Sequence, residues 1–113
     1  MNILLLGGNG ELGPHVVRAL EKSHRLRITD INDLDTDHQY MKVDSSDIDQ
    51  VVAASENMDA IINLSVLRRD RKLAFDVNAR GCYNMMIAAR EHGIKRLINT
   101  GPFYAVTGPT YER

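Results

Sequence analysis

Three glycines are spaced three residues apart near the start of the chain, at Gly7, Gly10 and Gly13. They directly follow an apolar run over 3–6 and open a segment whose apolar residues have helical spacing. A turn between a strand and a helix can hold phosphate, because the helix begins with free N–H groups and the positive end of its dipole. In such a loop one glycine permits a tight turn, one lets the backbone approach a pyrophosphate, and one lets the helix pack closely. The loop residues that we expect to bind a dinucleotide are Gly7, Asn9, Gly10, Glu11, Leu12 and Gly13.

An acidic residue ends the second apolar run. Asp30 lies 23 residues after Gly7, close to the spacing of about 20 at which a carboxylate binds the adenosine ribose. An anion there would repel the 2′-phosphate of NADP, and the glycine loop has no arginine to receive that phosphate. We therefore expect NAD rather than NADP. One simpler alternative is that Asp30 only starts a turn, and another is that the glycine-rich turn binds no ligand. A domain that binds a mononucleotide or flavin is a third alternative, but it would not require Asp30.

Alternating strand and helix patterns surround these residues. Short apolar runs predict five strands at 3–6, 26–29, 40–43, 59–64 and 96–99. Apolar spacings of three and four residues, together with capping residues, predict helices at 13–22, 47–54 and 71–92. The polar stretch 32–38 is expected to be a loop between two strands. This order predicts an α/β fold, a doubly wound Rossmann-type parallel sheet of about five strands with helices on both faces. Residues 1–113 should form one such NAD(P)-binding domain.

Composition excludes several other classes of protein. The 113 residues carry a net charge of −1, so no basic field exists to attract nucleic acid or an anionic membrane. Cys82 is the only cysteine, which excludes an internal disulfide, and the four scattered histidines give no metal-ligand spacing. No apolar run approaches the roughly 20 residues needed to span a bilayer. We therefore expect a cytoplasmic protein with no metal site.

Several later segments occur in the order seen in one known family. They are the glycine loop with Asp30, then Val43-Asp44, 59–65, 77–81 and 93–98. In this order the chain resembles the extended short-chain dehydrogenases/reductases, the NAD-dependent epimerase/dehydratase family, from Asn2 to about Gly108. The resemblance implies NAD as cofactor and, in the full-length protein, a small-molecule substrate, largely a nucleotide sugar. It also implies a possible homodimer, since members often pair through the helix expected at 71–92 and the next helix.

The resemblance also implies roles for matching positions. Asp44 and Ser45 would flank the adenine ring, with a helix-capping turn as the alternative. Leu64 and Ser65 would lie under the nicotinamide ribose and the diphosphate, although most members carry His-Leu-Ala-Ala across this segment. Asn78 would brace the framework of the active site, with an ordinary polar helix residue as the alternative.

The catalytic residues of the family are only partly present. Members carry a Ser/Thr after the fifth strand and a Tyr-x-x-x-Lys on the next helix, where the lysine lowers the pKa of the tyrosine. Thr100 is the candidate hydroxyl, and Gly101 and Pro102 stand where the serine is usual. No tyrosine has a lysine four residues on. We therefore interpret the chain as an N-terminal fragment of a longer enzyme. The alternative is a non-catalytic NAD-binding or regulatory module.

Other residues could suggest chemistry but have simpler interpretations. The basic group Arg68, Arg69, Arg71 and Lys72 is expected to be a solvated loop and helix start, with a phosphate contact as the alternative. Cys82 is expected to be a buried structural thiol. Met85 and Met86 are both expected to pack within the core.

Overall fold

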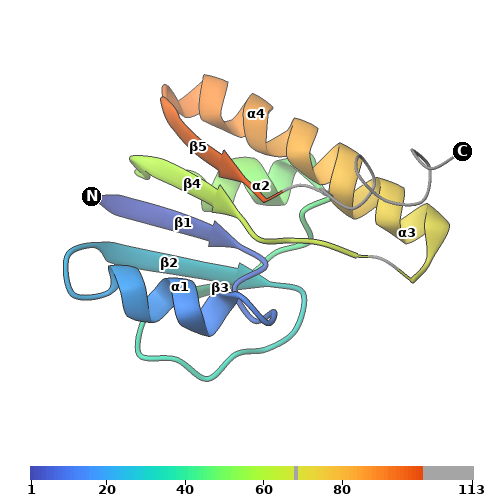
Figure 1. Cartoon of the computed structure of the whole chain (residues 1–113). Coiled ribbons are helices and arrows are strands. Elements are labelled where there is room, and N and C mark those ends of the chain that lie inside the picture. Colours follow the sequence, from blue (N-terminus) through green and yellow to red (C-terminus); the bar gives the residue numbers. More distant parts are fainter. Residues whose placement is uncertain (68, 101–113) are drawn as a thin grey trace, which may run out of the picture.

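Five parallel strands form one sheet in the computed structural model, which describes residues 1–67 and 69–100 (Figure 1). The strands are β1 (Asn2–Leu6), β2 (Arg25–Asp30), β3 (Gln39–Lys42), β4 (Ala60–Asn63) and β5 (Arg96–Asn99). Their order across the sheet is β3-β2-β1-β4-β5. The chain thus builds outward from β1 to β3 and then returns to the other side of β1. This confirms the predicted Rossmann-type fold, and ligands of such sheets bind beyond the carboxyl ends of the strands where the order reverses.

The central strand β1 is buried on both faces by helices. Ile3 and Leu5 pack toward α1 (Gly13–Leu20), which contributes Val16, Val17 and Leu20. The alternate residues, Leu4 and Leu6, belong to a second core on the opposite face. That core includes residues of α2 (Ile48–Ala54) and α4 (Gly81–His92), which lie together on that side (Figure 1). Burial of successive side chains on opposite faces explains why β1 is a continuous apolar run.

Two helix ends follow from the capping residues in the sequence. Asp47 begins α2, and its carboxylate accepts hydrogen bonds from the N–H groups of Asp49 and Gln50. Gly93 ends α4 with φ +67°, a left-handed conformation that glycine adopts without steric cost. Both caps confirm the predicted boundaries.

The expected regular helix over 71–92 is interrupted. The helical segment consists of α3 (Arg71–Phe75), a π-helical turn η1 (Asp76–Arg80) and α4. At the end of η1 the N–H of Gly81 donates to the carbonyl of Asp76, five residues earlier. The prediction of one uniform α-helix was therefore wrong in its middle turn. Apolar spacing could not reveal this turn. A single π turn shifts the helical register by one residue, but none of the η1 side chains is buried, so no buried residue marks the shift.

One segment outside the helices and strands contributes to the core. Residues 31–38 join β2 to β3 without a helix, and Leu34 packs against the α1-side core.

No helix within residues 1–67 and 69–100 is both long and apolar enough to cross a membrane.

Adjacent methionines on α4 provide a matched test of this packing. Met85 is 2% exposed, whereas Met86 is 49% exposed, so the expectation that both are core residues was wrong for Met86. We predict that Met85→Ala lowers the free energy of unfolding by about 2–5 kcal/mol, because it leaves a cavity against the sheet. Met86→Ala should change it by less than about 0.5 kcal/mol. Urea unfolding of both variants measures the difference, and equal losses would contradict the described orientation of α4.

Candidate functional site

The first glycine of the loop is required by backbone geometry. Gly7 has φ +73°, and a Cβ built there would lie 2.6 Å from the Ser65 Oγ and 2.7 Å from the Ser65 backbone nitrogen. A side chain would therefore be both strained and in collision with the segment after β4. The absence of a side chain lets the end of β1 approach Ser65 directly.

Two further glycines are required by close packing. A Cβ on Gly13 would collide with the carbonyl of Gly8, so α1 can begin against the loop only with glycine at this position. A Cβ on Gly8 would collide with the Ile28 side chain of β2. Gly8 was not among the predicted site residues. Its requirement comes from the tertiary contact with Ile28, which residue spacing does not reveal.

Gly10 differs from these three because the protein itself leaves room for a side chain there. The nearest atom to a Cβ on Gly10 is the Gly7 carbonyl oxygen at 3.5 Å, an ordinary van der Waals distance. Within the described residues, the backbone N–H groups of Glu11 and Leu12 have no hydrogen-bond partner. These amides immediately precede α1, whose positive dipole end adds to them. An open glycine beside free amides at a helix start fits a diphosphate, the group that the loop spacing predicts.

The Asp30 carboxylate joins the glycine loop to the turn after β2. Its Oδ2 accepts a hydrogen bond from the N–H of Asn9 at 3.1 Å, and its Oδ1 accepts one from the N–H of Asn32 at 3.0 Å. The side chain is half-buried. Asn9, expected among the ligand-binding residues, thus holds Asp30 through its backbone. This contact fixes the carboxylate at the carboxyl end of β2.

A cleft of about 270 Å³ lies beyond the carboxyl ends of the strands. Seven of the predicted site residues line it: Gly7, Gly10, Asp30, Asp44, Ser45, Leu64 and Ser65. Five others are not among its lining residues, namely Asn9, Glu11, Leu12, Gly13 and Asn78. The first four of these belong to the loop whose Gly7 and Gly10 line the cleft. Asn78 holds one wall of the cleft.

The wall after β4 is held by two asparagines. Asn78 in η1 bonds both backbone groups of Leu67: its Oδ1 accepts from the N–H at 3.1 Å and its Nδ2 donates to the carbonyl at 2.8 Å. The buried Asn63 accepts from the N–H of Ser65 and donates to the Asn99 Oδ1 at 2.8 Å. Asn63 was not among the predicted site residues, although a polar residue at the end of an apolar strand is a usable indication of a functional position.

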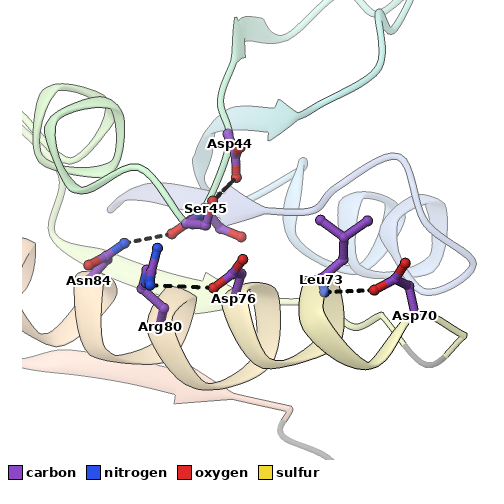
Figure 2. A network of polar contacts seen from close by, with 8 residues as sticks. Asp44, Ser45, Asp70, Leu73, Asp76, Arg80 and Asn84 are labelled. Carbon is purple, nitrogen blue, oxygen red and sulfur yellow. Dashed lines mark hydrogen bonds and ion pairs between the residues drawn. The ribbon is translucent and has the colours of Figure 1, made fainter.

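The opposite wall is tied to the long helical segment (Figure 2). Ser46 donates both its N–H and its hydroxyl to the Asp44 Oδ1, which closes a tight turn after β3. The buried Asn84 side chain donates to the Ser45 carbonyl at 2.9 Å. A Cβ on Gly81 would lie 3.1 Å from the Ser45 Oγ, so this glycine also permits close approach. The geometry of Asp44 and Ser45 is therefore set by helix contacts as well as by the turn.

Carboxylates predominate among the charged groups at the cleft. Asp30, Asp44 and Asp76 line it, whereas none of the described lining residues is a lysine or arginine. The Asp76 carboxylate lies 3.5 Å from the Arg80 guanidinium, four residues on in the same helical segment (Figure 2). Arg69, Arg71 and Lys72 of the basic group are exposed, and Arg68 lies outside the described residues.

The candidate catalytic hydroxyl, on Thr100, is hydrogen-bonded to the last residue of β4. The Thr100 hydroxyl donates to the Asn63 carbonyl at 2.9 Å, and Thr100 is not among the residues that line the cleft. Gly101 and Pro102, at the serine position of the family, lie outside the described residues. Cys82 is half-buried rather than buried. Across residues 1–67 and 69–100, no group of three or more His, Cys, Asp or Glu is placed to hold a metal ion.

Comparison with known proteins identifies the family. A sequence model of the NAD dependent epimerase/dehydratase family matches residues 3–111. The chain belongs to this family. It is 34% identical over 103 residues to a uronate dehydrogenase of Pseudomonas syringae pv. tomato, an alignment that covers 85% of this chain and 38% of that protein.

Solved structures of similar proteins have the same arrangement of strands and helices. A uronate dehydrogenase from Agrobacterium tumefaciens superposes with a TM-score of 0.80 at 27% identity, over 87% of this chain and 39% of that one. A short-chain dehydrogenase/reductase superfamily protein from Agrobacterium tumefaciens, solved with bound NAD, gives a TM-score of 0.81 at 25% identity. That match covers 88% of this chain and 32% of the other. This chain therefore spans 38–39% of the length of these uronate dehydrogenases.

Two glycine substitutions separate ligand contact from folding. We predict that Gly10→Val leaves the fold intact and abolishes dinucleotide binding, because the new side chain occupies the space that the diphosphate requires. Gly13→Val should instead lower the free energy of unfolding by about 1–3 kcal/mol or more, because its Cβ collides with Gly8. Circular dichroism during urea unfolding and calorimetric titration with NAD measure the two effects. Normal NAD binding by the Gly10→Val protein would show that Gly10 is only a turn residue.

Proposed function

We propose that this chain binds NAD as the cofactor-binding part of an oxidoreductase of the epimerase/dehydratase family. The observation that carries the proposal is the open Gly10, which faces the cleft beside free amides at the start of α1. The carboxylate of Asp30 at the edge of the same cleft adds a group suited to ribose hydroxyls. NAD complexes of similar proteins support this choice of cofactor.

Each part of the cleft has a separate task in this proposal. The amides of Glu11 and Leu12 donate to the diphosphate, and the dipole of α1 adds to their attraction for an anion. Asp30 accepts hydrogen bonds from the adenosine ribose, and the turn at Asp44 and Ser45 lies against the adenine. When bound, NAD supplies the hydride acceptor of the reaction. Protein residues of this region therefore bind and orient the cofactor.

The substrate that we propose is a sugar acid of the uronate type. The support is the printed activity of the relatives, which are uronate dehydrogenases at 34% and 27% identity. A nucleotide sugar, expected from the family resemblance, remains the alternative substrate. In either case a carbinol carbon loses a hydride and its hydroxyl loses a proton.

We further propose that this domain is part of a longer enzyme. All four residues of β5 are exposed, including Leu97 at 38% and Ile98 at 58%. Strands of parallel sheets are normally covered on both faces. An additional strand and helix packed against β5 would bury these apolar residues, and the relatives are long enough to contain such elements.

We also propose that two copies pair through the region of α4 to form a homodimer.

A non-catalytic NAD-binding module is the second candidate function. The feature that favours it is the presence of Gly101 and Pro102 where the family usually carries a serine. The two candidates share the cofactor site and differ only in turnover by the complete protein.

The cofactor preference tests the role of Asp30. We predict that the protein binds NAD more tightly than NADP, and that Asp30→Ala weakens NAD binding about tenfold or more, as expected for loss of a charged hydrogen-bond acceptor. The variant should also bind the two cofactors with more similar affinities. Asp33→Ala is the matched control, since this carboxylate is 90% exposed and does not line the cleft. Calorimetric titration gives all the dissociation constants, and equal or tighter NADP binding by the unaltered protein would refute the assignment.

Turnover separates the two candidate functions. We predict that the 113-residue chain forms no NADH from uronates or nucleotide sugars, because it has no Tyr-x-x-x-Lys to act as base. General base help contributes about 10²–10⁴-fold to such reactions, and substrate positioning lowers barriers by a further ~7–11 kcal/mol. A form extended by one further domain should form NADH from a uronate. Turnover by the 113 residues alone would assign the base to a residue within them, and failure of the extended form would favour the non-catalytic module.

A further inference from the structure

One side chain of β3 reaches across to the turn that carries Asp30. Tyr40 pairs with Ile28 of β2 in the sheet, so its ring stands beside the carboxyl end of β2. Its hydroxyl donates to the carbonyl of Asn32 and lies 3.3 Å from the carbonyl oxygen of Asp30. The same Asp30 carbonyl accepts from the N–H of Val43 at 2.9 Å. The backbone on both sides of Ile31 is therefore held from β3.

The turn at residues 31–38 has few other polar contacts with β3. Residues 31–38 form no helix or strand, and Ile31 is 60% exposed. A second link from β3, between the Lys42 ammonium and the Asp33 carboxylate, is 3.6 Å long and lies on the exposed surface. Exposed ion pairs of this type contribute little and are screened by salt. The Tyr40 hydroxyl is thus the principal polar link between β3 and the turn among the described residues.

The position of this turn decides where the Asp30 carboxylate lies. The Asn32 N–H donates to one carboxylate oxygen and the Asn9 N–H donates to the other. A shift of Asn32 would remove the first of these bonds and let the carboxylate rotate about its remaining contact. We infer that Tyr40 is a positioning residue for cofactor selection, which holds the Asp30 carboxylate where it accepts from a ribose and repels a 2′-phosphate. This inference rests on the proposed function.

The Tyr40 hydroxyl is suited to a permanent structural hydrogen bond. Burial raises the pKa of Tyr40 above its ordinary value, and the nearby carboxylates of Asp33 and Asp30 raise this pKa further. The phenol therefore keeps its proton at neutral pH and remains a donor to the turn.

Removal of this hydroxyl tests the inference. Tyr40→Phe keeps the ring and deletes only the donor, so we expect NAD affinity to fall about three- to tenfold, the effect of one hydrogen bond, while NADP affinity stays the same or rises. The matched control is Tyr83→Phe, since Tyr83 is 57% exposed on α4 and should change neither affinity. A merely structural role would lower stability and leave the NAD-to-NADP ratio of affinities unchanged, which would overturn the inference.

A double-mutant cycle shows whether Tyr40 acts through Asp30. In the Asp30→Ala protein, Tyr40→Phe should leave the ratio of NAD to NADP affinities unchanged, because the group that it positions is gone. An equal effect of Tyr40→Phe with and without Asp30 would contradict the inference. Absence of NAD binding by the unaltered protein would instead refute the proposed function.

Hydrogen exchange tests the same contact without cofactor. In Tyr40→Phe, the amide of Asn32, which donates to Asp30, should exchange faster, whereas amides in the centre of β1 should keep their protection. Unchanged exchange at Asn32 would overturn the inference whatever the cofactor result.

Discussion

The site depends on a close backbone approach that only glycine allows. Gly7 places the end of β1 directly against Ser65, while Gly8 and Gly13 bring the loop against β2 and α1. The N–H of Gly8 also donates to the Thr29 carbonyl at 2.8 Å, which ties the loop to the residue before Asp30. The glycine loop is therefore the junction of β1, β2 and the wall after β4. With these contacts made, Gly10 is free to face the cleft.

The charges around the cleft indicate how an anion would be held there. Its described lining has three carboxylates, Asp30, Asp44 and Asp76, and neither lysine nor arginine. Attraction for a diphosphate must then come from oriented N–H groups and the dipole of α1, which act only over the first turn of the helix. A ligand bound in this way is selected by its shape and its hydroxyl groups more than by its total charge. These charges are part of the basis on which we propose NAD rather than NADP.

Sequence patterns predicted the sheet, the strand positions and seven of the residues that line the cleft, because the apolar run of β1 and the glycine spacing are local features of the sequence. They missed contacts that depend on tertiary structure. The need for Gly8 comes from Ile28, and the tie between Asn9 and Asp30 joins residues 21 apart. Asn63 and Tyr40 were passed over because a polar group in a strand has no evident partner in the sequence. The π turn at 76–80 shifts the helical register by one residue, but none of its side chains is buried to mark the shift. Exposure distinguishes Met86 from Met85 only once α4 is packed.

We propose that NAD binds in the cleft beside the glycine loop, and an amide NMR titration with NAD shows whether it does. The largest shifts should fall on the amides of Glu11 and Leu12, with further shifts at Asp30, Ser45 and Ser65 along the cleft. The opposite end of the strands, around His24 and Asp59, should remain unchanged. Shifts confined to that opposite end, or no shifts at saturating NAD, would contradict the claim.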